Sequence, residues 1–212
     1  LGGEGQVSAF NKLNSEERNA NYSDIFGSGS SFFAIPRGKG PPTTWSIGFD
    51  SPPTTGFTAA KEKMLHLDIR SVKSNGAYYS REAFLALSED GVVVTWGYSS
   101  YGGDASTVQA LIDEVKVKDV FTLRVSLDSA KRPPYFGAFL LLTRNHSLIY
   151  LGGGSSYYRP PLDVQGRIVQ TRFQPVVAAS AKSFFAITMD GNIECIGKKN
   201  EPVNYKCPRN LG

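Results

Sequence analysis

Short apolar runs separated by polar turns dominate this chain. Two of the clearest runs are residues 83–87 (AFLAL) and 92–96 (VVVTW), with Glu-Asp-Gly between them at 89–91. β-Branched and aromatic residues favour strands. Asp-Gly suits a tight turn because glycine accepts a positive φ at little cost. The pattern predicts a β-hairpin, and because a lone hairpin is marginal in water, further strands are expected beside it.

The hairpin pattern recurs along the chain. Residues 138–152 and 183–197 align with it without a gap, and a weaker copy occupies residues 31–45. The residues that close the four hairpins are 51, 55 and 45 positions apart, and they are Trp45, Trp96, Leu151 and Ile196. Self-similarity at such a period, built from short strands, is typical of a propeller or a linear array.

An apolar strand precedes each hairpin, so each unit has three strands. These first strands are expected near residues 24–27, 67–72, 117–123 and 176–179. The connector after the second hairpin could form a short helix over residues 105–112. Two longer insertions, at 74–80 and 128–135, lengthen loops of the array, and such loops are where repeat proteins often bind partners.

The expected organisation has three parts. Residues 1–21 form an amino-terminal arm, residues 22–199 carry four repeats, and residues 200–212 form a carboxy-terminal tail. The repeats span about residues 22–50, 65–104, 115–158 and 174–199.

Composition supports a folded domain. Of the 212 residues, 41% are hydrophobic and 20% charged, which is typical of globular proteins. The net charge of +4 fits either an ordinary surface or a preference for an anionic partner. No apolar run reaches the length of a membrane-spanning helix. The chain begins at Leu1, as a processed precursor or a shortened chain would, so a targeting segment could already be missing.

Candidate chemistry is sparse. The two histidines, His66 and His146, lie in a strand lead-in and in a hairpin turn, where solvated or packed roles explain them. The two cysteines, Cys195 and Cys207, are too few for a disulfide scaffold or a cysteine zinc site. They could form one disulfide or remain free thiols. We therefore expect no catalytic residues, no metal site and no cofactor.

Two sets of residues stand out for other reasons. The first is expected to be structural and holds the repeats together: Phe84, Trp96, Gly97, Phe139, Phe184 and Trp45. The second consists of tyrosines and cations in connectors and inserted loops, where tyrosine supplies large contact area with a polar tip. These candidate partner-binding residues are Tyr78, Tyr79, Tyr98, Tyr101, Lys131, Arg132, Tyr135, Tyr157, Tyr158 and Arg159.

The repeats resemble those of the regulator of chromosome condensation family. The resemblance is carried by AFLAL at 83–87, DGVV at 90–93, TWG at 95–97 and YGGD at 101–104. It implies an all-β protein built from propeller blades. The family's Gly-x-x-His-Ser/Thr pattern is missing, since residues 80–84 read SREAF, and this departure argues against nucleotide exchange on a nuclear GTPase.

Four repeats are fewer than the seven blades usual in that family. The chain could form a small closed ring, an open arc whose ends meet another chain, or a part of a longer protein. The arc is favoured, so the expected fold is a partial or small β-propeller of about four blades. Propellers otherwise avoid exposed sheet edges by closing into a ring.

These observations predict a non-catalytic interaction scaffold or peripheral subunit of a multi-subunit complex, which binds proteins through its loops and open blade edges. A regulator of a small GTPase and a carbohydrate-binding propeller are the alternatives. Nucleic acid is not an expected partner. The Trp-Gly and Gly-Gly-Asp motifs of the repeats are also similar to those of repeat-rich proteins of unicellular algae and other protists. This similarity, a first residue other than Met and the positive net charge together favour an organellar location, plastid or mitochondrial and on the soluble side of a membrane complex, over the cytoplasm or nucleus.

Overall fold

Four antiparallel sheets of three strands each make up the described part of the chain. The computed structural model describes residues 15, 19–28, 31–46, 56–75, 82–123, 137–152, 173–179 and 183–197. For residues 45–46, 123, 173–179, 183–184 and 194–197 it describes the backbone only.

Each sheet, here called a blade, runs in chain order from its first strand to its third. Blade 1 contains β1 (Tyr22–Gly27), β2 (Ser31–Pro36) and β3 (Thr43–Ser46). Blade 2 contains β4 (Ile69–Ser74), β5 (Ala83–Ser88) and β6 (Val93–Gly97). Blade 3 contains β7 (Val117–Leu123), β8 (Ala138–Thr143) and β9 (Leu148–Gly152). Blade 4 contains β10 (Phe173–Ala179), β11 (Ser183–Thr188) and β12 (Ile193–Gly197).

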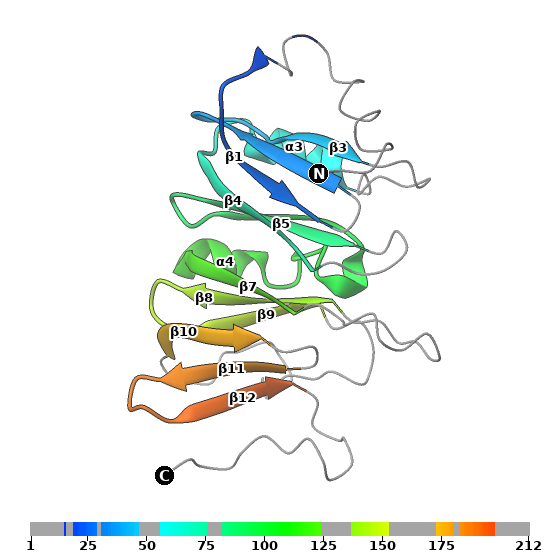
Figure 1. The fold of residues 1–212 in the computed structure, drawn as a ribbon. Coiled ribbons are helices and arrows are strands. Elements are labelled where there is room, and N and C mark those ends of the chain that lie inside the picture. The colour runs from blue at the N-terminus through cyan, green and yellow to red at the C-terminus, as the bar shows by residue number, and fades with distance from the viewer. Residues whose placement is uncertain are drawn as a thin grey trace, which may run out of the picture.

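The blades stack face to face in the order of the chain, with blade 1 at the top and blade 4 at the bottom of Figure 1. The first strands of neighbouring blades contact one another, β1 with β4, β4 with β7 and β7 with β10. Blades 1 and 4 lie at opposite ends of the stack, so the array is open (Figure 1). A closed ring would instead place these two blades side by side.

Three helical segments of the described residues pack against the blades. α3 (Phe57–Met64) contacts β6 of blade 2, and the 3₁₀ helix η1 (Ser99–Tyr101) contacts β9 of blade 3. α4 (Gln109–Val115) connects blade 2 to blade 3 and buries Ile112.

The hydrophobic core consists of layers between successive blades. We call the side of a blade that meets the next blade its forward face, and the opposite side its rear face. Phe33 on the forward face of blade 1 packs against Phe84 and Trp96 on the rear face of blade 2. Leu85 of blade 2 then packs in one cluster with Phe139 of blade 3.

Burial on both faces explains the sequence of the middle strands. All six residues of β5 are buried, and so are all six of β8. A strand covered on one side only would alternate between apolar and polar residues, whereas a strand covered on both sides is apolar throughout. The uninterrupted runs AFLALS and AFLLLT therefore mark blades with neighbours on both sides.

The prediction of an all-β, open array of four units is confirmed. Two helices differ from expectation. α3 was not predicted, because its only buried residues, Ala60 and Met64, form too short a stripe to be distinguished from a loop. The helix expected over residues 105–112 instead begins at Gln109, after a turn in which the Asp104 carboxylate accepts a 2.9 Å hydrogen bond from the backbone of Ser106.

Candidate functional site

The turns between second and third strands of blades 2, 3 and 4 share one geometry. In each, the last residue of the turn has a positive φ, at Gly91 (82°), His146 (67°) and Gly191 (89°). A hydroxyl at the start of each turn accepts a hydrogen bond from the backbone four residues later, at 2.9–3.0 Å, and these residues are Ser88, Thr143 and Thr188. A three-residue loop that ends in the left-handed region is a common hairpin connection.

The turn of blade 2 is packed against the next blade. The backbone amide of Val117, at the start of β7, donates a 2.9 Å hydrogen bond to the carbonyl of Gly91. A Cβ atom on Gly91 would lie 2.6 Å from the carbonyl oxygen of Val117. The guanidinium of Arg144 in blade 3 also donates a 2.9 Å bond to the carbonyl of Glu89. Glycine is therefore favoured at position 91 by its positive φ and required there by the approach of blade 3.

The corresponding turn of blade 4 is open. No described atom lies within 4 Å of a Cβ built on Gly191. The side chain of Met189, which replaces Glu89 and Arg144 of the other turns, is exposed. Ile193 begins the third strand and is 39% exposed, although its register equivalents Val93 and Leu148 are 2% and 3% exposed. The forward face of blade 4 thus retains apolar residues that the other blades bury.

The rear face of blade 1 shows the same contrast at the other end. Ile25 pairs with Ala34 and is 58% exposed. Its register equivalents in the first strands of blades 2 and 3, Val72 and Val120, are 3% and 4% exposed. Phe32 is half-buried at the place that the fully buried Phe84 occupies in blade 2.

We call these two surfaces the end faces. The forward end face contains Phe185, Ile187 and Ile193 of blade 4, and the rear end face contains Ile25 and Phe32 of blade 1. Exposed apolar surface of this kind marks an interaction site when it is contiguous rather than scattered. The end faces are therefore the candidate functional site.

Two carboxyl groups have shifted pKa values, and both shifts stabilise the charged form. Hydrogen bonds from the Thr188 hydroxyl and from backbone lower the pKa of Asp190, at the rim of the forward end face. Hydrogen bonds from Ser106, first from its backbone and then from its side chain, lower the pKa of Asp104. A general acid would need the opposite shift, so these two groups serve turn geometry.

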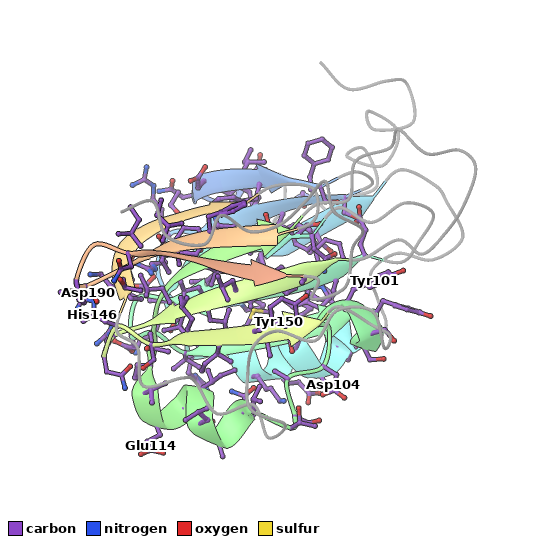
Figure 2. All side chains as sticks on the ribbon, turned by 90° about the horizontal axis from the view of Figure 1, so that it is seen from below. Tyr101, Asp104, Glu114, His146, Tyr150 and Asp190 are labelled. Carbon is purple, nitrogen blue, oxygen red and sulfur yellow. The ribbon has the colours of Figure 1, made fainter. Side chains whose placement is uncertain are left out.

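The structure separates two tyrosines that the sequence placed together as contact residues. Tyr98 is 40% exposed, and the centroid of its ring lies 5.0 Å from the centroid of the Tyr101 ring. Tyr101 is only 5% exposed and belongs to the core between blades 2 and 3, so its side chain is not available as contact surface. The short η1 helix turns it inward to pack beside blade 3. Figure 2 shows Tyr101 and Asp104 at one rim and His146 and Asp190 at the opposite rim.

A buried asparagine that the sequence did not single out holds this region in place. The side chain of Asn75 accepts a hydrogen bond from the backbone of Ala83 at 3.1 Å and donates one to the carbonyl of Tyr101. A Cβ on Gly137 would lie 2.5 Å from the Asn75 side chain. Asn75 thus joins the end of β4 to β5, η1 and blade 3, whereas the sequence analysis placed it in an inserted loop. Only the tertiary arrangement reveals this role.

The residues expected to be structural lie in the core where their side chains are described. Phe84, Trp96 and Phe139 are buried, and the rings of Phe84 and Trp96 stack with centroids 5.6 Å apart. Gly97 has a φ of 96°, and a Cβ there would lie 2.4 Å from the carbonyl oxygen of Glu82. The side chains of Trp45, Phe184 and Cys195 are not among those described.

The remaining predicted contact residues lie outside the described residues. They are Tyr78, Tyr79, Lys131, Arg132, Tyr135, Tyr157, Tyr158 and Arg159, and Cys207 lies outside as well. His66 follows α3 and is exposed. Within the described part of the chain, no three histidine, cysteine or acidic side chains come together as metal ligands. None of the helices in the described ranges has the length and apolar character to cross a membrane.

No family model matches the sequence. The curated proteins yield no match. Among solved structures, the chain is similar to the ectodomain of the receptor kinase CR4 from Physcomitrella patens, with 12% identity, a TM-score of 0.43, and coverage of 86% of this chain and 42% of that one. It is also similar to the CRINKLY WD40 ectodomain of the receptor kinase ACR4 from Arabidopsis thaliana, with 12% identity and a TM-score of 0.31. That match covers 88% of this chain and 66% of the other, so this chain spans less than two thirds of either ectodomain chain.

Proposed function

We propose that this protein is a non-catalytic interaction scaffold that binds another protein through its end faces. The observation that carries the proposal is the exposure of Ile25 and Ile193, at 58% and 39%, in register positions that the inner blades bury almost completely. Burying such apolar surface against a partner is favourable by about 25 cal/mol per Å². Two end faces give the chain two places to contact neighbours in a complex.

The finer form of the proposal is a peripheral subunit with a fixed stoichiometry. A blade face can be covered completely only by a surface of similar curvature and apolar character, because the core between blades is close-packed. Such a surface favours a permanent contact over a transient one. Exposed Tyr98 lies in the connector after β6 and could add polar contacts at the rim.

The experiment is native mass measurement of the protein purified from its own source, with tagged variants compared to the unmodified chain. The unmodified chain is expected to co-purify with its partner at a constant ratio. Ile25→Asp and Ile193→Asp each place a charge on an end face and should lower recovery of the partner at least about tenfold.

Leu65→Asp is the matched control. Leu65 is 51% exposed, but it caps the C-terminal end of α3 and belongs to neither end face. This variant should recover the partner as well as the unmodified chain does. Purification of the unmodified chain as an isolated monomer, or equal recovery with all three variants, would contradict the proposal.

A further inference from the structure

The two end faces are the two halves of a contact that this chain already makes internally. A forward face meets a rear face between blades 1 and 2, blades 2 and 3, and blades 3 and 4. Among the described residues, no blade follows the forward face of blade 4 and no blade precedes the rear face of blade 1 (Figure 1). A forward face packs against a rear face inside the chain. The forward face of blade 4 therefore fits a rear face such as that of blade 1, and the rear face of blade 1 fits a forward face such as that of blade 4.

The residues at the end faces follow the register of the internal contacts. Phe185 of β11 occupies the position of Phe33 in β2, and Phe32 occupies the position of Phe84 in β5. In the first internal contact, the rings of Phe33 and Phe84 have centroids 4.9 Å apart. A forward end face placed against a rear end face would therefore bring Phe185 beside Phe32.

The aliphatic positions agree with this match. Ile187 and Ile193 pair with each other on the forward end face, as Leu87 and Val93 do on the forward face of blade 2. Ile25 stands where Val120 packs into the core between blades 2 and 3. Each end face thus carries side chains of the type that its partner face accepts.

The turn of blade 4 also has space for a following blade. In blade 2, the start of β7 covers Gly91 and donates a hydrogen bond to its carbonyl. Around Gly191 of blade 4 the same space contains no described atom within 4 Å of a Cβ position. A first strand from another chain could approach Gly191 as β7 approaches Gly91.

We infer that the partner at each end face is a second copy of this chain, bound head to tail. This inference rests on the proposed function and names the partner. Two copies joined by two such contacts would form a ring of eight three-stranded blades, since the described residues of each copy supply four. Propellers commonly have four to eight blades, and a head-to-tail contact yields a ring when its rotation closes.

The test uses the purified full chain alone, followed by native mass measurement and light scattering. The unmodified chain should have twice the 23.0 kDa chain mass. Ile193→Asp and Ile25→Asp, each tested alone, should raise the dimer dissociation constant at least about tenfold, because each places a charge in both contacts of the ring. Leu65→Asp should remain dimeric, and circular dichroism should show the same strand content for all variants.

A mixture of the two face variants distinguishes head-to-tail pairing from other dimers. The Ile193→Asp chain retains an intact rear end face, and the Ile25→Asp chain retains an intact forward end face. Mixed together, they can form one unmodified contact, so a heterodimer should appear where each variant alone is monomeric. If only Ile193→Asp disrupts the dimer, blade 4 pairs with itself and the inference is wrong.

A second measurement does not depend on destabilising a face. Phe32→Cys and Phe185→Cys are combined in a chain with Cys195→Ser and Cys207→Ser, and a short bifunctional thiol reagent is added. Cross-linked dimers are expected from the double variant and not from either single variant. A monomeric unmodified chain that also fails to cross-link would overturn the inference. If that chain still captured a different protein through Ile25 and Ile193, the proposed scaffold function would stand without it.

Discussion

The turn of blade 2 and the turn of blade 4 have the same backbone geometry and different surroundings. Gly91 is covered by the start of β7, while Gly191 has no described neighbour within 4 Å of its Cβ position. Val93 and Ile193, which follow these turns, are buried in one blade and 39% exposed in the other. The comparison shows that the local hairpin forms from its own residues, whereas burial depends on the presence of a next blade.

The largest expected difference concerns one register position in two blades. Leu148→Ala removes a buried side chain between blades 3 and 4 and should lower the free energy of unfolding by about 2–5 kcal/mol. Ile193→Ala, on the open face, should cost less than about 1 kcal/mol in the monomer because water already reaches that side chain. Urea unfolding of both variants, each made in the monomeric Ile25→Asp chain, measures the difference. Equal losses would show that the face of blade 4 is covered.

The two glycines provide the next comparison. Gly91→Ala forces a left-handed φ on alanine and brings its Cβ against the backbone of Val117, so it should cost roughly 3 kcal/mol. Gly191→Ala has only the φ penalty and should cost about 1 kcal/mol. Thermal or urea unfolding of both variants, each made in the monomeric Ile25→Asp chain, gives both values. A larger loss for Gly191→Ala would mean that unseen contacts surround that turn.

The turn of blade 3 offers a third test, because His146 occupies the position that Gly91 and Gly191 hold in the other two turns. His146 has a φ of 67°, a conformation that side chains other than glycine adopt at a cost. His146→Gly should therefore raise the free energy of unfolding by about 0.5 kcal/mol, since relief of the φ strain exceeds the added entropy of the unfolded chain. Gly191→His should lower it. Opposite signs in urea unfolding are expected, and a loss from His146→Gly would show that the imidazole contributes more than its strain costs.

The smallest effect concerns Asp190 at the rim of the open turn. Its pKa lies below the ordinary value of 3.8, mainly because the Thr188 hydroxyl donates a hydrogen bond to its carboxylate. A lowered pKa in the folded state stabilises the protein above pH 3.8, and this contribution disappears as the pH falls through the lowered pKa.

The difference between the unfolding midpoints of the unmodified chain and Asp190→Asn should therefore shrink as the pH is lowered from 6 to below about 3. Glu89→Gln, in the covered turn of blade 2, is a control in an equivalent hairpin. A constant difference across this pH range would show that the Asp190 carboxylate is not involved.

Most of the local structure follows from the sequence alone. The apolar runs and the polar turns between them determine the hairpins, with Asp-Gly in the turns of blades 2 and 4, because strand preference and turn geometry depend on a few adjacent residues. The uninterrupted run AFLAL also indicates burial on two faces, since a half-exposed strand would alternate. The all-β class and the four units could therefore be predicted.

Only the tertiary structure decides which equivalent residues are buried. Ile25 and Val72 are alike in the sequence pattern, yet Ile25 is exposed and Val72 belongs to the core, because among the described residues a blade packs against Val72 and none packs against Ile25. The sequence predicts Tyr101 as a contact residue on the surface, whereas in the structure the η1 helix places its side chain in the core between blades 2 and 3. Exposure at the ends depends on long-range stacking, which no local pattern encodes, and so the end faces emerge only when the four blades are assembled.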